Sequence, residues 1–287
     1  AYEITEAKCQ YNSRTQTVEF TPAPLLMVDF YRDIHNADEW YEYVVKKPTE
    51  NARLANDIDF AGVQPKYIRV TSNYTGKLNG GKKDGCTYGY SLKNINFSSE
   101  KDAFVFSALY GEINGVVVED LNLGTAKTQT QDTTGFVRNL YGNVKNVHMK
   151  GVEIGGTDYI GSLVSYARPG SVIQDCTASN VTITYRELPN TNTTATVGGL
   201  IGHLNEARME NCYARDVNIT ATDLRGSRGI GGVIGYAYNS VIDSAYATGD
   251  ITARSMDVGG IVGQYVSGRA RACIKNIIAR VNVTCNQ

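Results

Sequence analysis

The sequence predicts an all-β protein that folds as a parallel β-helix (β-solenoid) with a short N-terminal helical cap. The first observation behind this prediction is the phrase Gly-Gly-apolar-apolar-Gly, which begins at Gly198, Gly231 and Gly259, with starts 33 and 28 residues apart. The second is a segment about ten residues after each phrase in which small or apolar residues alternate with others, a period typical of strands. Recurrence at this period is typical of repeat folds, whose coils pair at a spacing of about 4.8 Å. Six or seven coils would form a rod about 30 Å long.

Aligning the chain on the alternating segment extends the repeat from three coils to six. Weaker glycine phrases, at residues 134–137 and 160–164, fit the same register. The first and third residues of each aligned segment should point inward, and the middle residue outward. The six aligned segments are Leu121–Leu123, Val147–Met149, Cys176–Ala178, Cys212–Ala214, Ala245–Ala247 and Ile277–Ala279.

The glycines of the three phrases are expected to serve the structure, at tight turns and at close contacts between coils. Dinucleotide binding would need Gly-x-Gly-x-x-Gly between a strand and a helix, and no helical pattern follows here. Calcium-binding repeats need an Asp two residues past Gly-Gly-x-Gly, whereas Tyr236 and Gln264 follow the third glycine. We therefore expect no cofactor, no metal and no catalytic residues. The structural turn glycines are Gly198, Gly199, Gly202, Gly231, Gly232, Gly235, Gly259, Gly260 and Gly263.

One short polar residue stands just before each aligned segment. Such side chains hydrogen-bond the local backbone and tolerate tight bends, so stacked coils would carry them as a ladder at one corner. The alternative is a row of catalytic carboxylates. The column mixes Asp, Asn and Ser, however, whereas acid–base catalysis needs carboxyl groups at fixed positions. The predicted corner ladder consists of Asp120, Asn146, Asp175, Asn211, Ser244 and Asn276.

The first fifty residues differ from the repeats. We predict lead-in strands and a capping helix in residues 1–50, and a solenoid in residues 51–287. Asn36 is a candidate helix N-cap because Glu39 follows three residues later. Trp40 and Val44 would form the apolar face of this helix, and Pro48 follows its end. Within the solenoid, polar inserts at residues 125–133, 185–196 and 221–228 all fall after the second strand, so they should project from one flank.

Composition limits the class of partner. The chain has 28 Lys and Arg against 29 Asp and Glu, a net charge of -1, which gives no electrostatic basis for binding nucleic acid or an anionic membrane. No run of about 18 apolar residues is present, so direct membrane insertion is not expected. The chain starts at Ala1 without a leader pattern and stops just after an alternating segment. We therefore expect a piece of a longer protein, and we expect it to be a monomer.

The six cysteines leave the redox compartment open, because no Cys-x-x-Cys is present. Cys176 and Cys212 should face inward on neighbouring coils, where two buried thiols are favoured over a disulfide of poor geometry. The disulfide state stays open for Cys9, Cys86, Cys273 and Cys285, of which the last two lie in one coil.

Tyrosine is abundant, with 19 residues, and supplies a candidate ligand surface. An aromatic strip can lie against sugar rings or a protein partner, although tyrosine also suits a half-exposed strand without any ligand. No second ligand stands near His148 or His203, and both are expected to be solvated or packed on the surface. The candidate ligand surface consists of Tyr213 and Tyr246, on adjacent coils, with Tyr236 and Tyr238 near a glycine turn.

The Gly-Leu-Ile-Gly at residues 199–202, with variants at 232–235 and 260–263, resembles the GLUG repeat of bacterial surface proteins. Residues 54–60 (LANDIDF), 74–80 (YTGKLNG) and 92–95 (LKNI) resemble other strands of that family, and residues 30–34 with the Trp40 helix resemble its lead-in. The resemblance covers about residues 30–285. A similar arrangement occurs in the non-catalytic part of M26 (IgA1-specific) metallopeptidases and in adhesins. It implies a right-handed β-helix on an exported protein of the cell surface.

Two departures from the family pattern are present. An insertion interrupts residues 79–85, and the early coils lack the double glycine. The sequence also contains no His-Glu-x-x-His, so a peptidase zinc site of that kind does not lie in this segment.

Three function hypotheses follow. The leading one is a non-catalytic cell-surface module, adhesin-like or a spacer, that is attached through its parent protein and presents loops and tyrosines to a host protein or glycan. The alternative is a substrate-positioning accessory domain of an M26-like IgA1 metallopeptidase. The third is a carbohydrate-active β-helix enzyme, whose carboxylates would have to cluster at glycosidase spacing. The candidate carboxylates for this enzyme are Asp175 with Asp216 or Asp243.

Overall fold

The computed structural model describes residues 8–12, 17–21, 29–82, 89–100, 103–124, 133–185, 195–222, 229–254, 257–268 and 272–285. Contacts divide the chain into two compact units, Ala1–Phe30 and Tyr31–Gln287. In the first unit, β1 (Lys8–Asn12) and β2 (Thr17–Thr21) pair antiparallel. The predicted boundary at residue 50 separates the lead-in and capping helix from the solenoid. It differs from the division between these two units and stays a prediction.

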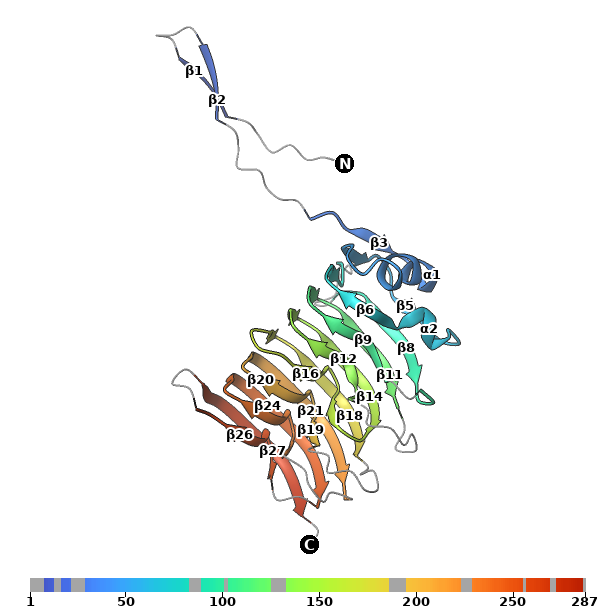
Figure 1. The fold of residues 1–287 in the computed structure, drawn as a ribbon, viewed down its shortest axis with the longest axis vertical. Coiled ribbons are helices and arrows are strands. Elements are labelled where there is room, and N and C mark those ends of the chain that lie inside the picture. The colour runs from blue at the N-terminus through green and yellow to red at the C-terminus, as the bar shows by residue number, and fades with distance from the viewer. Residues whose placement is uncertain are drawn as a thin grey trace. The chain divides into compact units, whose positions relative to one another are not determined.

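The second unit is a parallel β-solenoid, which confirms the predicted fold class. Figure 1 shows its strands stacked side by side, from the cap helices at one end to β26 and β27 at the other. Within the described residues the coils build a fourteen-stranded sheet, a seven-stranded sheet and a four-stranded sheet. The fourteen-stranded sheet has two limbs. A coil visits the seven-stranded sheet, the first limb and the second limb in turn, and from β15 on it also visits the four-stranded sheet.

The strands of the fourteen-stranded sheet fall into three groups. The first limb holds β3 (Arg32–Ile34), β4 (Ala52–Leu54), β7 (Lys77–Asn79), β10 (Glu112–Asn114), β13 (Asn143–Lys145) and β17 (Val172–Gln174). The second limb holds β5 (Ile58–Asp59), β8 (Ser91–Phe97), β11 (Val117–Leu123), β14 (His148–Gly156) and β18 (Thr177–Tyr185). Three long strands run through both limbs and join them, namely β21 (Arg208–Ala221), β24 (Val241–Ala253) and β27 (Cys273–Cys285).

The other two sheets close each coil. The seven-stranded sheet holds β6 (Val70–Tyr74), β9 (Phe104–Leu109), β12 (Gly135–Leu140), β16 (Val164–Ala167), β20 (Ile201–Asn205), β23 (Ile234–Tyr238) and β26 (Val262–Val266). The four-stranded sheet holds β15 (Tyr159–Gly161), β19 (Thr196–Gly198), β22 (Gly229–Gly231) and β25 (Val258–Gly259). Pairing of Gly161 with Gly198, and of Gly198 with Gly231, confirms that the weaker glycine phrase at 160–164 shares the register of the strong ones.

A short helix caps the first coil, as predicted. It comprises α1 (Ala37–Trp40), which continues as the π-helical turn η1 (Tyr41–Val45), and a further helix, α2 (Pro65–Ile68), lies beside it. The Asn36 side chain accepts a hydrogen bond from the Glu39 backbone N–H at 3.0 Å. Trp40 is fully buried, and its indole N–H donates to the Ile68 carbonyl at 3.0 Å. Its ring meets Phe60 edge-on at 5.6 Å, so the helix closes the apolar end of the stack.

The interior is filled by columns of apolar side chains, one from each coil. One column runs through Ile113, Val144, Ile173, Met209 and Ile242, all of which are fully buried. Burying a side chain of this size stabilises the fold by about 1.5–3 kcal/mol relative to leaving it exposed. The columns therefore tie each coil to its neighbours through the same interactions that fill its own core.

Two corners that recur from coil to coil adopt the left-handed backbone conformation. The first corner, between the two limbs, holds Asn146, Asp175, Asn211, Ser244 and Asn276, with φ values of 49°, 54°, 52°, 58° and 55°. Asn and Asp reach this conformation at low cost, which explains the mixture of short polar residues in the column. Side chains connect neighbouring coils, since the Asn211 amide donates to Asp175 Oδ1 at 2.5 Å.

The structure corrects the position of Asp120 in the predicted ladder. Val117 pairs with His148, and Leu121 pairs with Val152, so the alignment of Leu121 with Val147 was wrong by five residues. The first corner of that coil is Gly115, with φ 73°. Asp120, with φ 56°, belongs to the second corner, inside the second limb, together with Asn94, Gly151, Asn180 and Asp216. The error arose because both corners demand the same backbone and attract the same residue types.

Eight of the nine glycines of the repeated phrases lie where backbone approaches backbone, and the ninth, Gly260, lies against the Ala279 side chain. A Cβ on the first glycine, Gly231, would come within 2.0 Å of the carbonyl oxygen of Ile234 in the same turn. A Cβ on the second, Gly232, would come within 2.2 Å of the Gly260 carbonyl oxygen of the next coil. A Cβ on the third, Gly235, would come within 2.5 Å of the Val197 nitrogen in the four-stranded sheet. Space, and not a positive φ, therefore requires glycine at these positions.

The structure buries His148, which was expected to face outward. Only 8% of the residue is exposed, and Nδ1 lies 2.8 Å from Thr177 Oγ1 on the next coil. Burial lowers the pKa of His148 to about 4, with a smaller contribution from nearby Lys150 that Asp175 opposes. The imidazole is therefore neutral in the folded protein at neutral pH.

The cysteines that the structure describes with their side chains are free thiols. Cys176 and Cys212 are buried, as expected, and burial raises the pKa of the Cys212 thiol. Cys273 and Cys285 stand at opposite ends of the 13-residue strand β27, so the pairing left open for them is excluded by distance. Cys86 and most of the three polar inserts lie outside the described residues.

In the part of the chain that the structure describes, no helix has both the length and the apolar character needed to cross a bilayer.

Replacing Gly232 with alanine is expected to destabilise the solenoid by about 1–3 kcal/mol, the usual cost of overpacking. The added methyl group would meet a backbone carbonyl, which cannot turn away as a flexible side chain would. Urea denaturation should show the loss as a lower midpoint. Gly268→Ala is the matched control, because the nearest atom to its Cβ is Asn239 Oδ1 at 3.9 Å. Equal midpoints for the two variants would contradict this account.

At the first corner, Asn211→Ala should cost about 1–2 kcal/mol of unfolding free energy because alanine is strained at positive φ. Asn211→Gly should cost less, although it removes the same hydrogen bond to Asp175, because glycine adopts this φ freely. The order of the two denaturation midpoints is the measurement. An alanine variant more stable than the glycine variant would show that the left-handed backbone conformation does not determine the residue type at this corner.

Acidification should weaken the fold through His148. The folded pKa lies below the unfolded value of about 6.5, so the unfolded chain takes up the proton first, and stability present above pH 6.5 is lost as the pH falls toward 4. The loss between pH 7 and pH 5 should be about 2 kcal/mol. Urea titrations at the two pH values should show that His148→Gln loses about 2 kcal/mol less unfolding free energy than the parent chain. The same pH dependence in the variant and the parent chain would refute the assignment.

Candidate functional site

Three exposed tyrosines gather at the corner between the seven-stranded sheet and the first limb. Tyr110, Tyr141 and Tyr238 are 46%, 39% and 37% exposed, high values for rings of this size. We call the column to which they belong the tyrosine corner. It consists of Tyr110, Tyr141, Arg168, Asn205, Tyr238 and Val266.

Strand register places these residues in one column. Leu109 pairs with Leu140, so the next residues, Tyr110 and Tyr141, are neighbours. Leu140 pairs with Ala167, which brings Arg168 beside Tyr141. The column then continues because the coils that follow keep the same pairing through β20, β23 and β26. One residue at the end of each of the six strands from β9 to β26 in the seven-stranded sheet therefore builds a surface that crosses six coils.

Contacts with neighbouring side chains order Tyr110, Tyr141 and Arg168, the first three residues of the tyrosine corner. The rings of Tyr110 and Tyr141 stack with centroids 4.3 Å apart and planes 2° apart. The Arg168 guanidinium lies 3.8 Å from the ring centroid of Tyr166, and its Nη2 donates to Asn139 Oδ1 at 2.7 Å. Side chains that are already ordered lose little entropy on binding, which favours affinity.

The Tyr110 hydroxyl stays protonated at physiological pH, because its pKa is raised above the ordinary value. Partial burial raises the pKa of Tyr110, and its hydrogen bond with Tyr141 raises it further, while Arg168 opposes both. A phenol hydroxyl both donates and accepts, so this part of the corner offers hydrogen bonds of both kinds beside apolar rings.

A groove of about 680 Å³ adjoins the part of the tyrosine corner from Arg168 to Tyr238. Pro169, directly after Arg168, lines one part of it, and Asn239, directly after Tyr238, lines another. Most of its surface is apolar, and Glu206 and Arg208 bring one charge of each sign. Rings, an ordered arginine and an adjacent apolar groove are the composition found at the energetic centres of protein interfaces.

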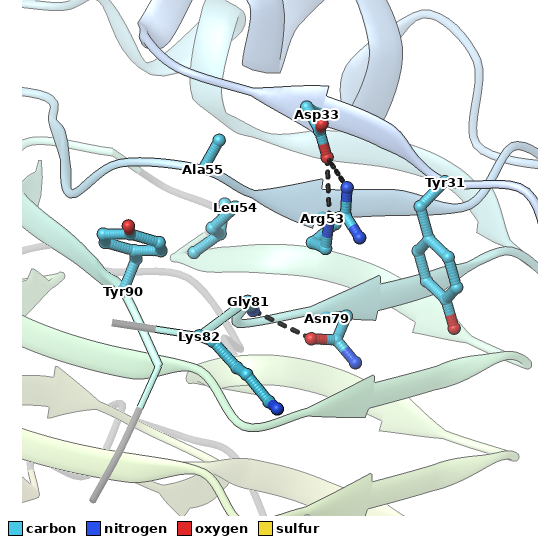
Figure 2. Close-up of a pocket in the computed structure, with 9 residues that line it drawn as sticks. All are labelled: Tyr31, Asp33, Arg53, Leu54, Ala55, Asn79, Gly81, Lys82 and Tyr90. Atoms are coloured by element: carbon cyan, nitrogen blue, oxygen red, sulfur yellow. Dashed lines mark hydrogen bonds and ion pairs between the residues drawn. The ribbon is translucent and has the colours of Figure 1, made fainter. Parts of the chain in front are cut away.

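A second hollow, the N-terminal pocket, lies beside the first coils and measures about 480 Å³. Figure 2 shows Arg53 of β4 paired with Asp33 of β3, with Nη2 and Oδ1 2.6 Å apart. Asn79 Oδ1 accepts a hydrogen bond from the Gly81 N–H at 2.8 Å. Tyr31 and Tyr90 stand on opposite sides of the pocket in this view, and Lys82 lies between them.

The structure distributes the four predicted surface tyrosines over three places. Tyr213 and Tyr246 are paired neighbours on the second limb and are half-buried, with the Arg215 guanidinium 6.0 Å from the Tyr246 ring. Tyr238 belongs to the tyrosine corner. Tyr236 is only 8% exposed, because its ring packs against His203 at 4.7 Å, so it does not form a ligand surface. His203 is buried within this same aromatic group, at 9% exposure.

The sequence patterns missed Tyr110, Tyr141 and Arg168. A signal for the first two was present, since Leu-Tyr-Gly occurs at 109–111 and again at 140–142. The misplaced register of the Leu121 coil hid this repeat, because it put the two segments at different points of the coil.

The carboxylates named for the enzyme alternative do not form the pair it requires. Asp216 is in the second corner, whereas Asp175 is in the first. Asp243 is bonded to Lys275 at 2.9 Å, and this hydrogen bond, with a second from Asn276, lowers its pKa. A general acid needs a raised pKa, so Asp243 is unsuited to that role. Among the described residues, no three His, Cys, Asp or Glu side chains are grouped closely enough to hold a metal ion.

Comparison with known proteins points in one direction. The model of the GLUG motif matches residues 226–252. An immunoglobulin A1 protease of Streptococcus pneumoniae is 28% identical over 243 residues, which cover 80% of this chain and 12% of that protein. Halomucin of Haloquadratum walsbyi is 31% identical over 161 residues, 50% of this chain and 2% of that protein. A solved structure of an IgA1 protease superimposes with a TM-score of 0.55 at 17% identity, covering 97% of this chain and 22% of that one, which supports the fold.

The chain thus corresponds in length to a small part of these relatives. The resemblance seen in the glycine phrases is confirmed: the chain is a β-solenoid that matches the GLUG motif at residues 226–252 and is similar to a region of immunoglobulin A1 proteases.

Proposed function

We propose that this chain is a non-catalytic binding module of an extracellular protein similar to the immunoglobulin A1 proteases, and that it binds immunoglobulin A1 through the tyrosine corner. The observation that carries the proposal is the stacked, exposed pair of Tyr110 and Tyr141, followed in the same column by the half-buried Arg168, where an apolar groove begins. Tyrosine and arginine are enriched among the residues that dominate binding energy at protein interfaces. The name of the relatives supplies the choice of partner.

The module would hold its partner while chemistry takes place elsewhere in the parent protein. A solenoid suits this role because its coils form a rigid rod with a long lateral surface. The column crosses six coils, so it would span roughly 24 Å at a spacing of about 4.8 Å per coil. That length matches the width of a standard protein interface better than the size of a small molecule. Attachment to the cell surface through the parent protein belongs to the same proposal.

A second candidate function is that of a spacer or adhesin, which would use the solenoid as a rod. The uninterrupted stack of parallel strands favours it (Figure 1). A spacer needs no specific surface, whereas an adhesin needs one. A spacer would have no partner at the tyrosine corner. An adhesin would have one, but a partner other than immunoglobulin A1.

The purified 287-residue chain is expected to bind immobilised immunoglobulin A1, measured by surface plasmon resonance, and to bind immunoglobulin G much more weakly. The double variant Tyr110→Ser/Tyr141→Ser should lose at least about tenfold in affinity, because tyrosine hot spots contribute about 2 kcal/mol or more.

Tyr67→Ser is the matched control for this experiment. Tyr67 is 37% exposed but lies on α2, outside the tyrosine corner. It should bind like the parent chain. No binding of immunoglobulin A1 by the parent chain would reject the proposed partner. Equal losses in the double variant and in Tyr67→Ser would reject the proposed surface.

A further inference from the structure

The N-terminal pocket carries a surplus of positive charge. Arg53 and Lys82 are cationic, and Asp33 supplies one negative charge, which is engaged by Arg53 at 2.6 Å. Among the described residues that line the pocket, the charge balance is therefore +1. A ligand with one negative charge would neutralise the pocket. It would accept a charge-assisted hydrogen bond, which is about twice as strong as a neutral one.

The walls of the pocket are apolar and aromatic. Leu54 and Ala55 lie behind it, and the rings of Tyr31 and Tyr90 flank it (Figure 2). Aromatic rings offer flat surfaces with a polar tip, which suit molecules that carry apolar C–H groups on one face and hydroxyl groups at the edge. A bare inorganic anion would use none of these walls.

Asn79 adds directed hydrogen bonding. Its side-chain oxygen accepts the Gly81 N–H at 2.8 Å, which fixes the plane of the carboxamide. The orientation of its NH2 group, with two N–H donors, is thereby set. Asp33, across the pocket, is an acceptor for hydroxyl groups. Donors and acceptors at fixed positions beside rings are what recognition of a polyhydroxylated ligand requires.

The form of the pocket favours one unit of a longer chain. A pocket built for a free small molecule encloses most of the ligand surface. This one is a hollow on the outer side of β3, β4 and β7, and a neighbouring unit of the same ligand could pass beyond its rim.

We propose that the N-terminal pocket is a binding site for a carboxylated sugar, such as a hexuronic acid unit of a polysaccharide. Lys82 contacts the carboxylate, Asn79 and Asp33 bind hydroxyl groups, and Tyr31, on the same side of the pocket as Asp33 and Asn79, stacks on one face of the ring. A neutral sugar would leave the surplus charge without a partner, and an acidic peptide side chain would leave the hydroxyl-binding groups unused. The site shares no residue with the tyrosine corner, so it stands or falls independently of the function proposed above.

The test compares methyl glucuronide with methyl glucoside, which differ in the carboxylate, in titrations of the 287-residue chain followed by amide chemical shifts. The acidic sugar should shift the amides of residues 53–55 and 79–82, with a dissociation constant of about 1 mM and about tenfold tighter binding than the neutral sugar. Lys82→Gln should abolish this preference. Lys66→Gln, which removes an exposed lysine of α2 outside the pocket, should keep it.

Three results would overturn the proposal. The first is equal binding of the two sugars, and the second is an unchanged preference in Lys82→Gln. The third is tighter binding of a capped glutamyl peptide than of methyl glucuronide at the same residues, since that would assign the pocket to an acidic protein segment.

Discussion

The rest of the structure depends on how closely the backbone of one coil can approach the backbone of the next. At Gly232 the next coil is so near that a single methyl group would come within 2.2 Å of a carbonyl oxygen. At Gly235 and Gly263 the seven-stranded sheet lies against the backbone of the four-stranded sheet in the same way. Glycine is the residue that leaves room for such contact. The glycine phrases therefore leave room for backbone contact at the place where these coils turn from the four-stranded sheet into the seven-stranded sheet.

This spacing turns a single residue of each coil into a continuous surface. Once the pairing of Leu109 with Leu140 is fixed, the residue that follows must stack on its counterpart, and Tyr110 and Tyr141 do so at 4.3 Å. The same constraint produces the first-corner column of short polar side chains, where Asn211 reaches Asp175. Structural ladders and candidate binding surfaces thus arise from one geometric cause. What separates them is the type of side chain and whether neighbours satisfy it.

The fold could be predicted from the sequence because its strongest requirement is local. A glycine that must tolerate backbone contact leaves a visible period, and the Asn36 cap with Trp40 leaves a visible helix start. The candidate site could be predicted only in part, because it depends on register. Asp120 and Asn146 look equivalent in sequence, yet they belong to different corners that share one backbone conformation. Tyr236 and Tyr238 are two residues apart, yet one is buried against His203 and the other is exposed. Whether a neighbouring coil buries a side chain can be predicted only once the coils are paired in the correct register.

Register also explains why two separate surfaces can coexist on one repeat fold. In a globular domain a change at one site disturbs the packing of others, but coils of a solenoid contact only their neighbours. Tyr141 and Arg168 are ordered by the coils at the middle of the stack, through Tyr110, Tyr166 and Asn139. The Arg53–Asp33 pair of the N-terminal pocket is ordered by the first two strands of the first limb. Each surface therefore rests on its own coils, so a change at one surface leaves the contacts that order the other unaltered.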